Sequence, residues 1–218
     1  MLIKICGLTR QSDANLAESL GAHYLGAILA GGPRHLTPDQ AMQVLGPRRH
    51  TVLRVAVFGT QSRTEIAQIA EQLALDVVQL HGDQSAEDIE WLLSRTGREV
   101  WPVVRVAGTE LPPETVERAQ AARAVLLDAK VVGQLGGTGV ALDWQGLQGE
   151  LAALRERVPG VRVVLAGGLN ATNLLTARGL LNPDVVDVSS GVELAPGIKN
   201  PVALEAFMNA ARTTANHD

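Results

Sequence analysis

The sequence predicts an α/β protein, a single (β/α)8 TIM barrel with phosphate-binding loops at its C-terminal end. Short apolar runs rich in Val, Ile, Leu and Ala alternate eight times with longer stretches of helical period in 218 residues. The apolar runs are almost uninterrupted, which is typical of parallel strands covered on both faces. Glycine clusters follow the last three runs, where such barrels commonly bind phosphate.

Each predicted strand is bounded by Gly, Pro, Asn or Asp, and several predicted helices begin near a Ser, Thr, Asp or Asn that can cap them. Eight strand–helix units of this length fit one compact barrel. The strands are expected at 2–6, 24–29, 52–58, 77–80, 100–106, 124–128, 161–166 and 185–189, and the helices at 11–20, 38–45, 62–73, 85–95, 113–121, 144–157, 171–179 and 201–212.

An open, doubly wound sheet is the alternative fold, and it predicts a glycine-rich fingerprint after the first strand. No such fingerprint follows residues 2–6, so the barrel is favoured. No Pro/Gly/Ser linker, low-complexity tract or block of charge divides the chain, which predicts one domain over residues 1–218. Residues 215–218 are expected to form a frayed tail.

Composition narrows the class of protein. With 46% hydrophobic residues, 19% charged residues and a net charge of −4, the chain is expected to be globular and cytoplasmic. Its single cysteine excludes an internal disulfide, and no segment resembles a signal peptide or a membrane span. Basic residues are scattered and only 3% of residues are aromatic, which argues against nucleic acid as a partner. A small molecule is the expected ligand.

The glycine clusters predict that this ligand is phosphorylated. Gly167 and Gly168 end a strand and precede a helix, so backbone N–H groups there can face an anion. Any one such cluster is more often a simple turn, but three of them follow successive strands. The candidate phosphate-binding residues are Gly137, Thr138, Gly139, Gly167, Gly168, Ser189, Ser190 and Gly191.

Cys6 and Asp128 are the candidate proton-transfer groups. A lone cysteine is most often a small buried hydrophobe, and an aspartate at a strand end can be a structural group. Both, however, lie at carboxyl ends of predicted strands, where a barrel builds its active site. An acid and a base facing one sugar would suit an isomerisation.

Four further residues are expected near the end of the barrel at which Cys6 and Asp128 lie. Arg34 could hold a carboxylate by two parallel hydrogen bonds, and His81 could orient a substrate, although either could be a simple loop residue. Lys4 shares a strand face with Cys6, so we expect Lys4 to pair with Asp187 inside the barrel and to favour the Cys6 thiolate. No cluster of His and acidic residues has metal-ligand spacing, so no metal is expected.

Together these segments resemble the phosphoribosylanthranilate isomerase family of tryptophan biosynthesis. The resemblance runs in order from the first strand to the last and includes the opening cysteine segment, which other phosphate-binding barrels do not share. Its motifs are Lys4-Ile5-Cys6-Gly7-Leu8-Thr9, Gln79-Leu80-His81-Gly82, Leu126-Leu127-Asp128, Gly136-Gly137-Thr138-Gly139 with Asp143-Trp144, Leu165-Ala166-Gly167-Gly168-Leu169-Asn170 and Asp187-Val188-Ser189-Ser190-Gly191-Val192-Glu193.

The resemblance implies a cofactor-free Amadori rearrangement of N-(5-phosphoribosyl)anthranilate to 1-(2-carboxyphenylamino)-1-deoxyribulose 5-phosphate. It implies that Asp128 is the general acid, that Cys6 is the general base, and that Arg34 lies near the anthranilate carboxylate. It also makes His81 and Asp187 candidate substrate-binding residues and the glycine and serine loops a phosphate cradle. The oligomeric expectation is a monomer or a homodimer.

Two departures and two rival functions accompany this resemblance. The segment before Arg34 lacks the family's usual phenylalanine and serine, and Asn200 stands where aspartate is common. Another sugar-phosphate isomerase would need aspartates at the ends of the first and fifth strands, where Cys6 and Val106 stand. A non-catalytic barrel that only binds a phosphorylated ligand would not need both Cys6 and Asp128.

Overall fold

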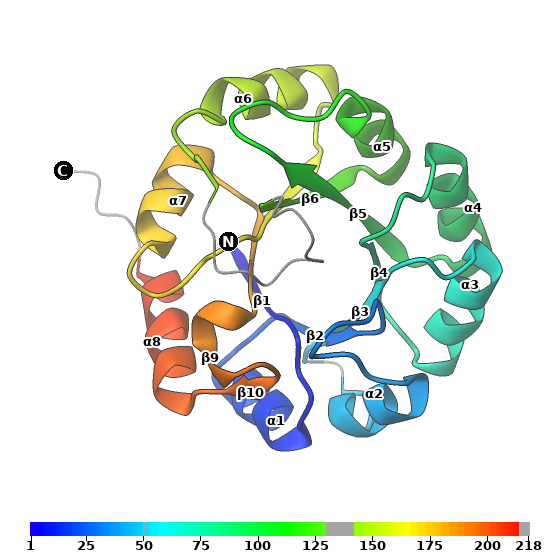
Figure 1. The fold of residues 1–218 in the computed structure, drawn as a ribbon, viewed down its shortest axis with the longest axis vertical. Helices are drawn as coiled ribbons and strands as arrows, with labels where there is room; N and C mark the ends of the chain where they lie inside the picture. The colour runs from blue at the N-terminus through cyan, green and yellow to red at the C-terminus, as the bar shows by residue number, and fades with distance from the viewer. Residues whose placement is uncertain (50, 130–141, 214–218) are drawn as a thin grey trace.

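Eight parallel strands close into a barrel in the computed structural model, which describes residues 1–49, 51–129 and 142–213 (Figure 1). Pairing of the first strand with the last closes the ring, with Leu2 opposite Val185 and Ile5 opposite Val188. The predicted fold class is confirmed. The strands are β1 (Leu2–Ile5), β2 (Tyr24–Ile28), β3 (Leu53–Phe58), β4 (Val77–Leu80), β5 (Glu99–Val106), β6 (Ala124–Ala129), β7 (Arg162–Leu165) and β8 (Val185–Val188).

Helices surround the barrel and cover the outer face of its strands (Figure 1). Two of them, α6 and α7, begin three or more residues later than predicted. Asn170 accepts hydrogen bonds from Thr172 and Asn173, and Asp143 accepts one from Gly146, so turns precede both helices. The helices are α1 (Gln11–Ser19), α2 (Pro38–Leu45), α3 (Arg63–Gln72), α4 (Ala86–Thr96), α5 (Thr115–Ala122), α6 (Gln148–Arg157), α7 (Leu174–Leu181) and α8 (Pro201–Arg212).

Two apolar layers hold the barrel. The larger layer packs the helices against the outer face of the strands, and the smaller one fills the barrel interior. In the interior, the rings of Tyr24 and Trp101 meet edge to face at 5.0 Å between centroids, and Val77 packs with them. These residues occupy the early inward positions of their strands. The later inward positions, toward the carboxyl ends, are free to line a cavity.

The segment after β8 differs from the prediction. The expected strand 185–189 ends at Val188, and a short 3-10 helix, η1 (Ser190–Val192), follows it. A hairpin of two short antiparallel strands, β9 (Glu193–Ala195) and β10 (Ile198–Lys199), then leads to α8. Asn200 caps α8 by accepting hydrogen bonds from Val202 and Ala203, so the exchange from aspartate leaves the cap intact.

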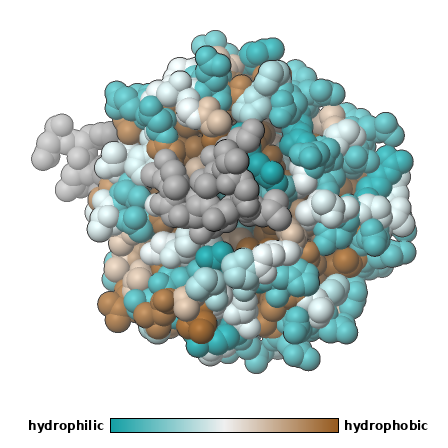
Figure 2. All heavy atoms as spheres, viewed as in Figure 1, coloured by the Kyte–Doolittle hydropathy of each residue, from teal (hydrophilic) through white to brown (hydrophobic). Residues whose placement is uncertain are grey.

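Figure 2 shows a mostly hydrophilic face with one apolar area over the β9–β10 hairpin and the start of α8. Its exposed apolar side chains include Leu194, Ile198 and Val202. Among the residues that the structure describes, no helix is long and apolar enough to cross a membrane. The predicted tail at 215–218 lies outside the described residues.

Candidate active site

A cavity of about 590 Å³ opens at the carboxyl ends of the strands. Its volume is in the usual range for a small-molecule site. Every strand except β5 contributes a lining residue directly or through the loop that follows it. The lining residues include Cys6, Ile28, Arg34, Val57, Gln79, His81, Leu126, Asp128, Ala166, Gly167, Gly168, Leu169, Asp187, Ser189, Ser190 and Gly191.

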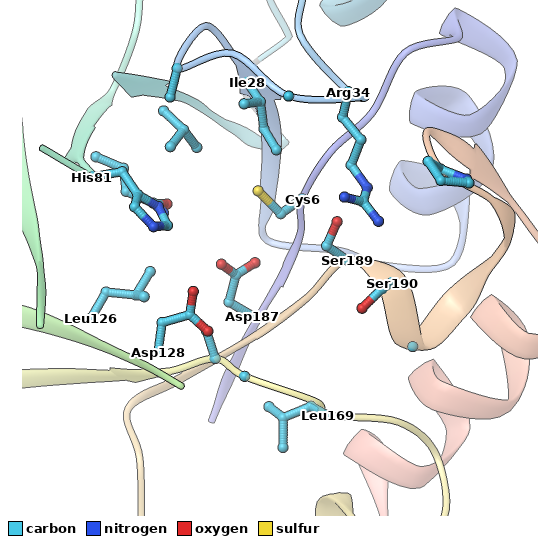
Figure 3. A pocket seen from close by; sticks show the side chains of 18 of the residues that line it. Cys6, Ile28, Arg34, His81, Leu126, Asp128, Leu169, Asp187, Ser189 and Ser190 are labelled. Carbon is cyan, nitrogen blue, oxygen red and sulfur yellow. The ribbon is translucent and has the colours of Figure 1, made fainter. Parts of the chain in front are cut away.

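The alternation of side chains along the strands explains why these residues meet. Cys6 directly follows β1, two positions after the inward-facing Lys4, and Ser189 directly follows β8, two positions after Asp187. In Figure 3, Cys6, Asp128 and Asp187 point into the same space, with Asp187 below Cys6 and Asp128 on the side of β6. The structure therefore brings the two candidate proton-transfer groups to one cavity.

Lys4 and Asp187 form the ion pair expected from the sequence. The Lys4 Nζ donates to Asp187 Oδ2 at 2.8 Å, and the lysine is fully buried. Burial alone lowers the pKa of Lys4, but the charges of Asp187 and Cys6 outweigh this and raise it above its usual value. Lys4 is therefore a permanent positive charge at neutral pH. The second oxygen, Asp187 Oδ1, has no hydrogen-bond partner among the residues described here.

Lys4 favours the Cys6 thiolate, as expected, but burial and Asp187 oppose it. Burial raises the pKa of the Cys6 thiol, the charge of Lys4 lowers it, and the charge of Asp187 raises it again. The net pKa is above the ordinary value, so Lys4 favours the thiolate only in part. Burial and Asp187 therefore favour the protonated thiol in the free protein. Sequence alone could not supply the depth of burial that decides this balance.

Asp128 keeps its proton far better than an ordinary aspartate. Burial, followed by the charge of Asp187, raises the pKa of Asp128 to about 6, although the Ala129 N–H bonds Asp128 Oδ1 at 2.9 Å and opposes the rise. Near neutral pH a useful fraction of Asp128 is therefore protonated. This is the property that a general acid requires.

His81 presents a neutral imidazole to the same cavity. Burial, with the charges of Arg105 and Lys4, lowers the pKa of His81 to about 4. The backbone carbonyl of His81 accepts a hydrogen bond from Arg105 on β5, which fixes the loop. His81 can therefore offer hydrogen bonds to a ligand but carries no charge at neutral pH.

Arg34 holds a carboxylate along one edge of its guanidinium, but that carboxylate belongs to the chain itself. The Arg34 Nε lies 2.9 Å and the Nη2 2.7 Å from the carboxylate oxygens of Glu193 on β9. The two guanidinium nitrogens that were expected to bind a ligand carboxylate are thus already bonded to Glu193. Nη1 makes no hydrogen bond within the described part of the chain. Arg34 remains at the cavity wall.

Glu193 also joins Arg34 to the loop after β8. Lys199, fully buried on β10, donates to Glu193 Oε1 at 2.8 Å and to the carbonyl of Ser189 at 3.1 Å. Burial alone would raise the pKa of Glu193, but Arg34 and Lys199 hold it below its usual value. Sequence reasoning gave neither Glu193 nor Lys199 a role, because only the short hairpin brings them together.

Gly7, directly after Cys6, makes room for this arrangement. Its backbone has φ +67°, a conformation that favours glycine. A Cβ at Gly7 would lie 2.6 Å from both Arg34 Cδ and Ser189 Oγ. The glycine therefore lets the side chains of Arg34 and Ser189 approach the end of β1.

The predicted phosphate loops converge at one side of the cavity. Gly167 and Gly168 have φ of +82° and +69°, and a Cβ on Gly191 would lie 1.9 Å from the carbonyl oxygen of Leu169. Only glycine permits the two loops to approach so closely. Ser189, Ser190 and Gly191 line the cavity beside them. The other predicted phosphate residues, Gly137, Thr138 and Gly139, lie outside the described residues.

The arrangement carries acid–base groups and anion-binding loops but gathers no metal-ligand set. In the described ranges, no three His, Cys, Asp or Glu side chains lie together in a way that could hold a metal ion. The chemistry that the lining residues themselves offer is proton transfer on a phosphorylated ligand.

Comparison with known proteins gives a consistent result. Residues 3–210 match the family model of N-(5'-phosphoribosyl)anthranilate (PRA) isomerase. An N-(5'-phosphoribosyl)anthranilate isomerase of Desulfovibrio desulfuricans is 41% identical over 97% of this chain and 95% of its own length. Another, from Cereibacter sphaeroides, is 37% identical over 96% of this chain and 98% of its own.

Solved structures of such isomerases share the fold. The crystal structure of phosphoribosyl anthranilate isomerase from Thermus thermophilus is 36% identical, with TM-score 0.80, covering 97% of this chain and 98% of that one. A second isomerase, in complex with reduced 1-(o-carboxyphenylamino)-1-deoxyribulose 5-phosphate, is 30% identical with TM-score 0.79, with coverage of 97% and 98%. A dimeric isomerase from Thermotoga maritima, solved as monomers, is 32% identical with TM-score 0.77, covering 97% and 98%.

Proposed function

Because this chain belongs to the N-(5'-phosphoribosyl)anthranilate isomerase family and is such an isomerase of tryptophan biosynthesis, we propose that Asp128 and Cys6 carry its proton transfers. The observation that supports this most strongly is their shared cavity, in which Asp128 has a pKa of about 6. A carboxylic acid that is still partly protonated near neutral pH and a thiol facing the same sugar form an acid–base pair.

In the first step Asp128 gives its proton to the furanose ring oxygen. The bond from C1 to that oxygen breaks, and the nitrogen lone pair forms a C=N bond, which leaves a protonated imine. The negative Asp128 that remains is held by its hydrogen bond from Ala129 and by the charges of Arg105 and Lys4. These groups stabilise the negative charge of Asp128, which burial alone would disfavour.

In the second step the thiolate form of Cys6, whose own proton has passed to solvent, removes the proton from C2 and becomes a thiol. The protonated imine makes that proton acidic and adds positive charge beside a thiol that Lys4 and Lys199 already draw toward ionisation. The electrons of the C2–H bond form a C1=C2 double bond, and the C=N π electrons return to nitrogen as a lone pair, which gives a neutral enolamine. The enolamine takes a proton at C1 and releases the proton of the C2 hydroxyl, which yields the ketone.

The remaining cavity residues hold the substrate in this scheme. Gly167, Gly168, Ser189, Ser190 and Gly191 bind the phosphate through backbone N–H groups and hydroxyls, and Gly137, Thr138 and Gly139 complete the cradle. The free Nη1 of Arg34 binds the anthranilate carboxylate. His81 and the free oxygen of Asp187 contact the sugar. These proton transfers need no cofactor.

The test follows the fluorescence decay of freshly prepared N-(5-phosphoribosyl)anthranilate. We expect turnover with the wild type, and losses of at least about a hundredfold in kcat for Cys6→Ser and Asp128→Asn. Glu205→Gln, on the exposed side of α8, is the control and should retain full activity. Undiminished turnover in either active-site variant would refute the role of that residue.

A further inference from the structure

Gln79 is a buried amide on the floor of the cavity that the proposed reaction does not use. It lies on β4 between the inward positions of Val77, in the barrel interior, and His81, at the mouth. Only 3% of its surface is exposed. Val57 on β3 and Trp101 on β5 lie beside it in the sheet register, so its surroundings are apolar.

The amide of Gln79 has no protein partner in the described part of the chain. Its Oε1 is buried and has no hydrogen-bond partner among the described residues. A glutamine kept for structural reasons normally pairs with the protein, as Gln61 does with Gly59 and Leu29. Gln79 instead lines the cavity. Its hydrogen-bonding capacity is therefore directed toward a ligand.

We propose that Gln79 binds a hydroxyl of the substrate's sugar and so contributes to substrate specificity. The inference rests on the proposed function. An oxygen such as Gln79 Oε1 needs a donor, and ionised phosphate and carboxylate groups offer only acceptors. The sugar hydroxyls both donate to Oε1 and accept from Nε2.

The barrel order agrees with this assignment. β4 lies four strands from β8 in the closed ring, so Gln79 stands opposite the loop of Ser189 and Ser190. A phosphate bound at that loop directs the sugar across the cavity toward Gln79. The phosphate itself stays at the far wall. Loss of the Gln79 amide should therefore affect sugar binding without affecting phosphate binding.

The test compares Gln79→Met with the wild type in binding and in stability. The ligands are reduced 1-(o-carboxyphenylamino)-1-deoxyribulose 5-phosphate, ribulose 5-phosphate and inorganic phosphate. We expect Kd to rise about tenfold for the two sugar phosphates and to change less than about twofold for phosphate. Ribulose 5-phosphate lacks the aromatic amine, so an unchanged Kd for it would exclude a sugar hydroxyl as the partner.

The stability arm separates a ligand-binding role from a structural one. Methionine has a similar shape, and the substitution breaks no hydrogen bond to a described residue, so the Tm of the free protein should not fall. Gln84→Met is the matched control, because Gln84 Nε2 donates to Gly59 O at 2.6 Å, and its Tm should fall. A fall of equal size in Gln79→Met would overturn the inference.

The same measurements distinguish failure of this inference from failure of the proposed function. If the wild type neither converts N-(5-phosphoribosyl)anthranilate nor binds the reduced product, both the proposed function and the inference are refuted. If the wild type does both and Gln79→Met binds the reduced product equally well, only the role of Gln79 is refuted. An equal loss of affinity for inorganic phosphate would also refute it.

Discussion

Cys6 shows how charge and burial compete at a single atom. Lys4 draws the thiol toward ionisation, while burial and Asp187 oppose it, and the opposing effects are larger in the free protein. Because Lys4 and Asp187 are themselves paired at 2.8 Å, each of them changes the field that the other exerts on the sulfur. Removing either partner should therefore shift the ionisation of Cys6, and the two shifts should have opposite signs.

We expect Lys4→Met to raise the pKa of Cys6 further and Asp187→Asn to lower it. The rate of thiol alkylation measured against pH gives the midpoint of the Cys6 titration in each variant, since only the thiolate reacts. Each variant serves as the control for the other. Midpoints that move together, or that do not move, would contradict an electrostatic origin of the shift.

The raised pKa that suits Asp128 to acid catalysis also lowers the stability of the folded protein at higher pH. Its pKa rises from 3.8 to about 6 on folding, so the folded state binds the proton more tightly than the unfolded state. The contribution to stability is therefore full below about pH 4 and is lost as the pH rises through about 6. A shift of about two pKa units corresponds to roughly 3 kcal/mol at higher pH.

Asp128→Asn should accordingly be more stable than the wild type at pH 8, by about 1 to 3 kcal/mol, and this advantage should shrink by about half toward pH 5. Urea unfolding at the two pH values measures the difference. Comparison with the wild type at each pH cancels the opposite effect of His81, whose lowered pKa weakens the fold as the pH falls below about 6.5. An advantage independent of pH would contradict this explanation.

At the scale of elements, the β9–β10 hairpin determines where Arg34 points. Glu193 on β9 accepts hydrogen bonds from both Arg34 and Lys199, and Lys199 holds the carbonyl of Ser189. The loop after β2 and the loop after β8 are thereby connected through one buried carboxylate. Two cations share a single anion, so the group keeps a net positive charge for a substrate carboxylate.

Glu193→Gln should leave two buried cations without a compensating charge and lower stability by about 3 kcal/mol. Because Arg34 would lose its position while Cys6 and Asp128 keep theirs, we expect KM to rise by about tenfold or more and kcat to change less. Steady-state kinetics and urea unfolding measure the two effects, with Glu205→Gln as the exposed control. A fall confined to kcat would show that Glu193 does not act through Arg34.

The comparison of sequence with structure is also clearest at this scale. Periodicity locates all eight strands and helices, because each is long enough to show its apolar pattern. Strand alternation is sufficient to predict the Lys4–Asp187 pair. The hairpin of three and two residues is too short for any period, so Glu193 and Lys199 were missed. The pKa of Cys6 depends on burial, which no local pattern encodes.

At the scale of the whole molecule, barrel closure makes the two ends of the chain depend on each other. β1 pairs with β2 and with β8, so the strand that precedes Cys6 is held in place by the last strand of the barrel. Asp13 on α1 also accepts a hydrogen bond from the backbone of Lys199 near the end of the chain. The cavity is therefore complete only when both ends of the chain are in place.

We propose on this basis that residues 1–218 form one domain that unfolds in a single step. Tryptophan fluorescence reports on the part of the chain around α4, β5 and the segment before α6, where Trp91, Trp101 and Trp144 lie. Circular dichroism reports on all helices. Their urea transitions should coincide. Reduced 1-(o-carboxyphenylamino)-1-deoxyribulose 5-phosphate at a hundred times its Kd should raise the free energy of unfolding by about 2.7 kcal/mol for both probes. The cavity is built from both ends of the chain, so ligand binding stabilises the whole barrel only if the barrel unfolds cooperatively. A tryptophan transition that stayed fixed while the circular dichroism transition shifted would mean that the two halves unfold independently.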